Sequence, residues 1–142
     1  MFWGNKKKEN IEFSNIEIAV CTLLIHAART DDSYSLKEKE LIKTSLNKLG
    51  IVNLDYINRL IKYCEIKETD SVEIYNFTKE IKKFKYEYRL EIVEMMLKII
   101  YSDKKLCYLE DRLIRKIAGL IYIENKDLGN LKRSVKNDIY SK

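Results

Sequence analysis

Proline is absent from this 142-residue sequence, and glycine occurs only four times. Because these two residues interrupt helices most often, their scarcity favours a chain of helices with few forced breaks. So few glycines also leave no glycine-rich loop of the kind that cradles a phosphate. Histidine occurs once, as His26, and no serine lies in a nucleophile turn. Hydrolase chemistry therefore has no support, and we expect a protein that is not an enzyme.

The three cysteines are odd in number, lie far apart and form no C-x-x-C pair: they are Cys21, Cys64 and Cys107. This spacing argues against a disulfide scaffold and against a thiolate zinc site, so we expect buried, reduced thiols. No stretch approaches the roughly 20 apolar residues of a membrane span. The first four residues run straight into Lys6–Lys8, without the apolar segment of a secretory signal. We therefore expect a cytoplasmic protein without a transmembrane segment.

Helical periodicity dominates the chain, and no segment alternates with period two. We predict seven helices, at about 15–29, 36–49, 54–66, from after Asp70 to about 81, 86–101, 108–121 and from about 125. Two S-x-x-E capping boxes begin the first two helices, and Gly50 lies in the left-handed position that ends the second. We expect residues 1–12 to form a mobile arm and residues 13–142 to form one all-α domain.

The sequence also contains a paired pattern of acids. Glu38 follows Asp31 by seven residues, and Glu110 follows Asp103 by seven residues. The second pair lies 72 positions after the first, as positions 31 and 103 show. We therefore predict a duplicated helical hairpin, in which one acid follows the first helix and another begins the second. Four carboxylates arranged in this way could share one cation.

At these residues the chain resembles the TerB-like (tellurite resistance protein B) family. The resemblance lies in 26–32 with Glu38, in 99–105 with Glu110, and in the segment 84–90, which is similar to the family's F-x-Y-E-x-R-L. It implies an all-helical, non-enzymatic adaptor or sensor of tellurite or stress response, with a protein partner that can be membrane-associated. It also implies a divalent cation at Asp31, Glu38, Asp103 and Glu110. The family's glycine after each aspartate is replaced here by Asp32 and Lys104.

The four acids have two interpretations. Carboxylates suit a hard cation such as Ca²⁺ or Mg²⁺, which prefers oxygen ligands. Alternatively, a glutamate at the third helical position bonds back to the cap, and an aspartate can cap a turn. Glu38 behind Ser35 fits the capping role directly, whereas Glu110 has Cys107 at the matching position.

A second function class rests on the lysines Lys79, Lys82, Lys83 and Lys85, which lie beside Phe84 and Tyr86. Basic residues interleaved with aromatic residues can bind nucleic acid or phosphate, although such a run is more often a solvated face. We keep a nucleic-acid or phosphate-binding module as the alternative. For Arg89 we expect either a counter-charge to the acidic cluster or a solvated side chain.

Overall fold

The computed structural model describes residues 13–29, 34–70, 74–103 and 108–140. Of residues 67–70, 74–75, 103, 108–110 and 139–140 it describes only the backbone. Within the described residues the chain forms seven α-helices and one 3-10 helix, and no strand. In order these are α2 (Asn15–Ala28), α3 (Leu36–Lys48), α4 (Leu54–Asp70), α5 (Ile74–Ile81), α6 (Tyr86–Ile100), η1 (Tyr101–Asp103), α7 (Tyr108–Leu120) and α8 (Asn125–Tyr140). The prediction of an all-α fold with about seven helices is confirmed.

Two helix ends differ from the prediction. Helix α4 continues to Asp70, beyond the predicted end at residue 66, because the apolar stripe stops there but no residue interrupts the backbone. Tyr101, which we placed in an α-helix, instead begins the 3-10 helix η1. The last turn of a helix often tightens in this way, since its final carbonyls lack partners four residues on.

The local signals that begin and end the first two helices are confirmed. Ser14 caps α2 and Ser35 caps α3, each through a complete capping box. In the first box, the Ser14 Oγ accepts from the Glu17 N–H and the Glu17 carboxylate accepts from the Ser14 N–H, both at 3.1 Å. After α3, Gly50 has a φ of 113°, a value that residues with a Cβ rarely adopt.

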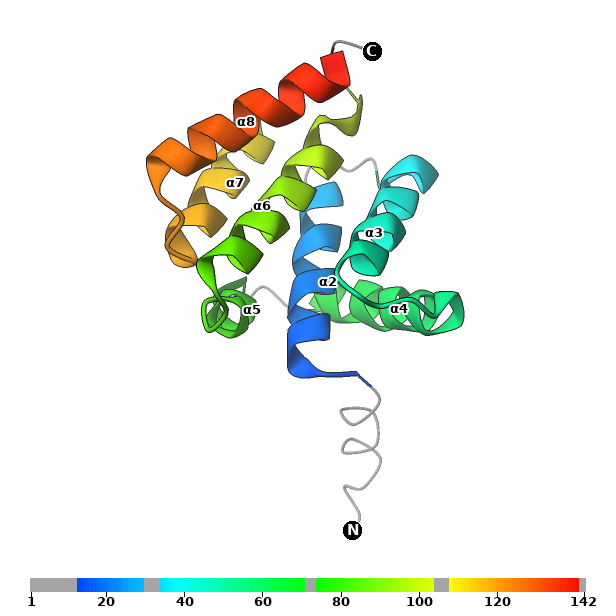
Figure 1. Cartoon of the computed structure of the whole chain (residues 1–142). Helices are drawn as coiled ribbons and strands as arrows, with labels where there is room; N and C mark the ends of the chain where they lie inside the picture. Colours follow the sequence, from blue (N-terminus) through cyan, green and yellow to red (C-terminus); the bar gives the residue numbers. More distant parts are fainter. Residues whose placement is uncertain (1–12, 30–33, 71–73, 104–107, 141–142) are drawn as a thin grey trace.

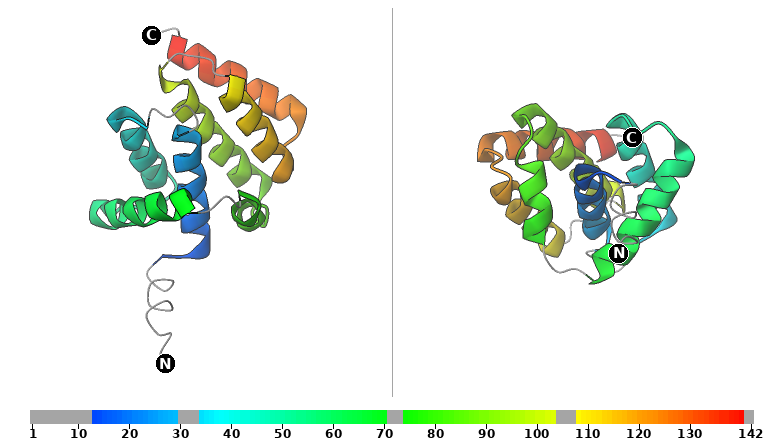
Figure 2. Two further views of the ribbon diagram at one scale, coloured as in Figure 1. Left: turned by 180° about the vertical axis from the view of Figure 1, so that it is seen from behind. Right: turned by 90° about the horizontal axis from the view of Figure 1, so that it is seen from below.

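Helices α2 and α6 form the centre of the molecule. Helix α2 packs against α3, α4, α5 and α6, and α6 also packs against α3, α7 and α8. Figure 2 shows α2 between α4 on one side and α5 on the other. Ten of the 14 residues of α2 are buried, which is the burial expected of a helix that is apolar nearly all round. The remaining helices cover this central pair.

The helix bounds follow the spacing of the predicted repeat. Helices α3 and α7 begin at Leu36 and Tyr108 and end at Lys48 and Leu120, so both ends are separated by the same 72 positions as the acids. In Figure 1 the C-terminal ends of α2 and α6 point toward the same end of the molecule. The acid-bearing connections follow these two ends. A shared origin of the two halves stays a prediction.

Candidate cation site at the two acid turns

The acid turns are the two connections that carry the predicted metal ligands: residues 29–35 between α2 and α3, and residues 101–107 between α6 and α7. Asp31 lies outside the described residues. The backbones of Asp103 and Glu110 lie in η1 and α7, and nothing is described of their side chains. Glu38 is therefore the one predicted ligand whose side chain can be placed.

Glu38 is a buried carboxylate in the first turn of α3, and only 3% of the residue is exposed. Its Oε1 accepts from the Ser35 N–H at 2.8 Å, and its own N–H donates to the Ser35 Oγ at 3.1 Å. The capping interpretation is thus confirmed for this residue. A carboxylate has about four lone-pair positions, so the cap bond by itself does not exclude a role in cation binding.

A hydrogen bond links the first turn of α3 to the second acid turn. The Lys37 Nζ donates to the Ser102 carbonyl oxygen at 2.9 Å, across 65 positions of sequence. Lys37 immediately precedes Glu38, and Ser102 immediately precedes Asp103. The bond therefore brings the start of α3, which carries Glu38, close to the backbone that leads to Asp103. It also holds the Lys37 ammonium against the second acid turn.

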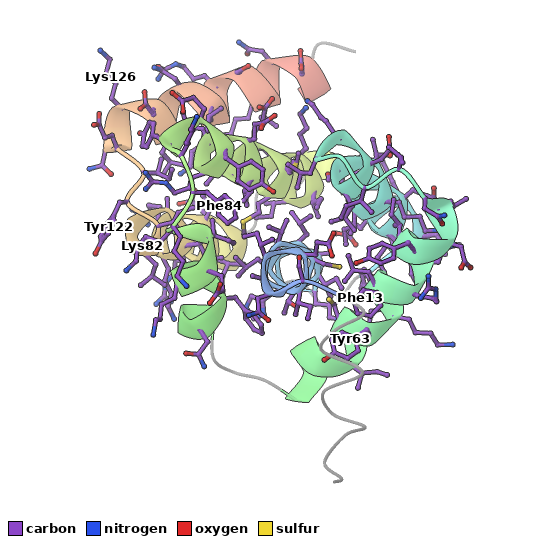
Figure 3. All side chains as sticks on the ribbon, turned by 60° about the horizontal axis from the view of Figure 1, so that its bottom comes forward. Phe13, Tyr63, Lys82, Phe84, Tyr122 and Lys126 are labelled. Carbon is purple, nitrogen blue, oxygen red and sulfur yellow. The ribbon has the colours of Figure 1, made fainter. Side chains whose placement is uncertain are left out.

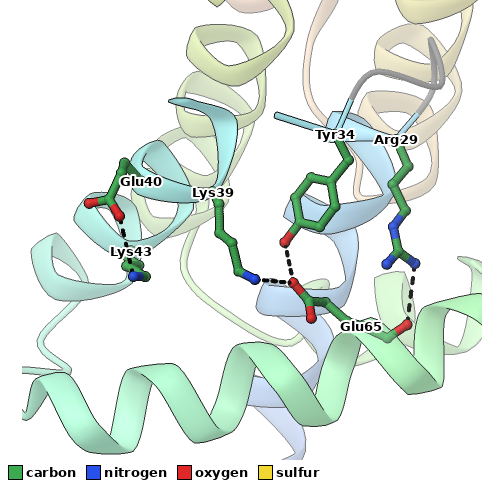
Figure 4. A network of polar contacts seen from close by, with 6 residues as sticks. All are labelled: Arg29, Tyr34, Lys39, Glu40, Lys43 and Glu65. Atoms are coloured by element: carbon green, nitrogen blue, oxygen red, sulfur yellow. Dashed lines mark hydrogen bonds and ion pairs between the residues drawn. The ribbon is translucent and has the colours of Figure 1, made fainter. Parts of the chain in front are cut away.

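Glu65 on α4 holds both ends of the first acid turn (Figure 4). The Arg29 Nη1 donates to the Glu65 carbonyl oxygen at 3.2 Å, and the Tyr34 hydroxyl donates to the Glu65 Oε2 at 2.7 Å. Lys39 adds an ion pair to the same carboxylate oxygen at 3.0 Å. Burial, followed by the bond to Glu65, raises the pKa of the Tyr34 hydroxyl. The residues on either side of the segment 30–33, which contains Asp31, are therefore both bonded to α4.

No sequence pattern predicts this role for Glu65. The residue lies 31 positions from Tyr34, and on α4 it follows the buried Cys64 in an otherwise ordinary amphipathic pattern. Contacts between distant segments leave no local spacing to recognise. The local feature that bears on this contact is Tyr34, an aromatic residue close to Asp31.

Among the side chains that the structure describes, no three His, Cys, Asp or Glu residues are grouped so that they could hold a metal ion. Three of the four predicted ligands are not among these side chains. The cation at Asp31, Glu38, Asp103 and Glu110 therefore stays a prediction.

The expectation that Arg89 acts as a counter-charge to the acidic cluster was wrong. The Arg89 Nε donates to the Phe84 carbonyl oxygen at 3.1 Å, and its Nη1 donates to the Ile121 carbonyl oxygen at 2.6 Å. In the same segment the Tyr86 hydroxyl donates to the Asp127 Oδ2 at 2.5 Å. The arginine is half-buried and bonds to backbone carbonyls, so it is not a counter-charge to the acid turns. It joins the α5–α6 turn to the α7–α8 turn, at the opposite end of α6.

Comparison with known families identifies the family of the chain. The family model described as tellurite resistance protein TerB matches residues 17–133. The chain belongs to the TerB family. The match spans both acid turns and the segment of Arg89, and it does not favour the nucleic-acid or phosphate alternative. Tellurite resistance is the name of the family, and the match does not show that this chain acts on tellurite.

A search of the curated proteins found no match. A search of the solved structures likewise found none. Of the helices in the described residues, none has the length and apolar character needed to cross a membrane.

Proposed function

We propose that this TerB-family protein is a small adaptor or sensor whose partner-binding form is set by a divalent cation at Asp31, Glu38, Asp103 and Glu110. The observation that carries the proposal is the bond from Lys37 to the Ser102 carbonyl, at 2.9 Å. It connects the positions next to Glu38 and Asp103, which belong to different halves of the chain. Without that proximity, two pairs of acids that lie 72 positions apart in the sequence could not bind one cation together.

The donor set suits a hard cation. All four proposed ligands are carboxylates, and Ca²⁺ and Mg²⁺ prefer oxygen ligands. Glu38 is already buried and oriented by its cap, so little ordering of that side chain is required. A cation bound there would neutralise facing acids that otherwise repel one another.

The response would arise from the packing of the two hairpins. Helices α2 and α6 pack against each other, and each leads directly into an acid turn. A change of charge between the turns would favour one angle between the α2–α3 and α6–α7 hairpins over another. A partner that binds one of these arrangements more tightly would then sense the cation. Glu65, through Tyr34 and Arg29, transmits the same change to α4.

Thermal melting with Ca²⁺, Mg²⁺, Mn²⁺ and Zn²⁺ tests the cation directly. A ligand that binds only the folded state at about 100 times its dissociation constant stabilises that state by about 2.7 kcal/mol, so the melting temperature should rise. The shift should be lost in Asp31→Asn and in Asp103→Asn. It should persist in the control Asp55→Asn, which removes an acid that pairs with Arg59 on α4.

Glu38→Gln separates ligation from capping, because glutamine can still bond back to the cap residue. This variant should keep most of the metal-free stability and lose most of the cation response. No shift of the unmodified protein at millimolar concentrations of any of the four metals would leave only the capping role.

A further inference from the structure

Gly50 and Tyr122 occupy equivalent positions at the ends of two helices. They lie 72 positions apart, each two residues after the last residue of its helix, α3 or α7. Both have positive φ values, 113° for Gly50 and 60° for Tyr122. The same pair of backbone hydrogen bonds closes each end, from Gly50 to Asn47 and Ile51 to Leu46, and from Tyr122 to Gly119 and Ile123 to Ala118. Both are Schellman endings, for which glycine is the usual residue.

Tyrosine is an unfavourable choice for such an ending. The left-handed conformation brings its Cβ close to the following carbonyl, which glycine avoids. Burial of the ring does not compensate, because Tyr122 is 66% exposed. It is also the only non-glycine residue with positive φ in the part of the chain that the structure describes. Local strain of this kind concentrates where a side chain serves a function.

A second unfavourable choice lies at the same end of the molecule. Lys85 is the residue before α6, and its side chain makes no capping bond. Helices α2 and α3 both begin with a serine that does. A lysine there also places a positive charge beside the positive end of the helix dipole. Two positions thus carry residues that stability alone would not favour.

These residues belong to one surface, which we call the basic-aromatic end: Lys82, Lys83, Phe84 and Lys85 of the α5–α6 turn, and Tyr122 of the α7–α8 turn. The Lys82 Nζ lies 4.8 Å from the centroid of the Tyr122 ring. Phe84 is 38% exposed, and Lys83 and Lys85 are exposed. Figure 3 shows Lys82, Phe84 and Tyr122 together on one side of the molecule. Arg89 fixes the two turns to each other.

We propose that the basic-aromatic end docks on an anionic lipid surface. The surface consists of two turn tips that carry exposed aromatic rings next to lysines, and such rings settle at the headgroup level of a bilayer. Lysines near an anionic bilayer each add roughly 1 kcal/mol of attraction. Nearby acids offset this charge only in part, because Glu80 pairs at 3.5 Å with a Lys83 side chain that is still 69% exposed, and Asp127 accepts from Tyr86.

The ring contacts favour lipid over single-stranded nucleic acid. Base stacking needs an open aromatic face. The Lys82 ammonium lies over one face of Tyr122, which leaves at most the other face for stacking, and the Phe84 ring packs against the Tyr88 ring with centroids 5.0 Å apart. Bilayer insertion needs only the exposed edge of each ring.

Vesicle flotation tests the proposal, with phosphatidylcholine vesicles with and without phosphatidylglycerol as about a third of the lipid. The full chain is used at low salt with a chelator, so that the outcome does not depend on the proposed cation. Binding should require phosphatidylglycerol and weaken as salt rises. Lys83→Gln combined with Lys85→Gln should weaken binding roughly 25-fold, about fivefold for each charge. The matched control, Lys48→Gln combined with Lys62→Gln, removes two exposed lysines of α3 and α4 and should bind as the unmodified protein does.

Tyr122→Gly is the sharpest variant, because it installs the residue that the equivalent position already uses. It should weaken vesicle binding while the melting temperature stays within a few degrees. Tyr122→Asn, which also tolerates the left-handed conformation, serves if the glycine variant melts much lower. The proposal is overturned if anionic vesicles do not bind at low salt, or if both lysine pairs matter equally. It is also overturned if a single-stranded oligonucleotide binds more tightly than the vesicles and loses affinity in the same variants.

Discussion

The Tyr34 hydroxyl donates to the Glu65 carboxylate at 2.7 Å, and this contact ties the connection between α2 and α3 to α4. The pair is partly buried, and Lys39 shares the same carboxylate oxygen. The position of the first acid turn is therefore set by a helix that contributes none of the proposed ligands.

Tyr34→Phe should lower the free energy of unfolding by about 1–2 kcal/mol, because it removes a hydrogen bond to a charged group. Urea denaturation measures the change. A double-mutant cycle with Glu65→Gln isolates the pair. A coupling energy below about 0.3 kcal/mol would show that the two side chains act independently.

Stability should fall as the pH rises above about 10, the ordinary pKa of tyrosine. Burial, followed by a bond to Glu17, raises the pKa of Tyr56 to about 12, and burial with the bond to Glu65 raises that of Tyr34. The unfolded chain then loses these protons first, so stability present below pH 10 is lost as the pH rises toward the folded-state pKa. Urea midpoints measured from pH 8 to 11 should drop less in Tyr34→Phe and in Tyr56→Phe. An unchanged slope in both variants would contradict the assignment.

The predictable parts of this fold are those with local causes. The boxes at Ser14 and Ser35 and the stop at Gly50 follow from spacings of a few residues, and the structure contains all three. Glu65 and Arg89 act across 31 and 32 positions, to Tyr34 and Ile121, and no local pattern records such contacts.

Tyr122 is an intermediate case, because a signal for it was present. The 72-residue offset that relates the acids also aligns Tyr122 with Gly50. That alignment would have predicted a left-handed tyrosine. Conformational propensity alone does not predict it, because a bulky residue rarely adopts a positive φ.

Arg89→Lys should cost about 1–2 kcal/mol of stability, although the charge is retained. The guanidinium donates to two carbonyls in different turns, and a lysine ammonium on a flexible stem cannot reproduce that fork. Arg59→Lys is the control, since Arg59 pairs with Asp55 on its own helix and is 50% exposed. It should change the urea midpoint by less than about 0.5 kcal/mol. Equal effects of the two substitutions would contradict the role given to Arg89.

The Asp111–Lys132 contact between α7 and α8, at 2.7 Å, should stabilise the folded protein at neutral pH and should cease to do so at low pH. The hydrogen bond from Lys132 lowers the pKa of Asp111, so the contribution is present above about pH 4 and lost as the pH falls through the lowered folded-state pKa. The pair is a third exposed, so we expect only about 0.5 kcal/mol. Asp111→Asn should therefore be less stable than the unmodified protein at pH 7 and equal to it near pH 2. A difference that persists at the lower pH would indicate lost packing rather than lost charge.

Gly50→Ala should destabilise the protein, whereas Tyr122→Gly should leave its stability nearly unchanged, although the two positions are equivalent. No atom lies within 4 Å of a Cβ added at Gly50, so alanine meets no clash and only the φ of 113° opposes it. A left-handed residue with a Cβ costs roughly 1–2 kcal/mol, and Gly50→Ala should lose about that much. Tyr122→Gly gains the same term, but it loses the contact with Lys82 and admits more freedom in the unfolded chain, each worth about 0.5–1 kcal/mol. Its stability should therefore stay within about 1 kcal/mol of the starting value in urea denaturation. If Tyr122→Gly instead destabilises the protein by more than about 2 kcal/mol, the ring contributes more to folding than its contact with Lys82 accounts for, and Tyr122→Asn becomes the variant that tests vesicle binding.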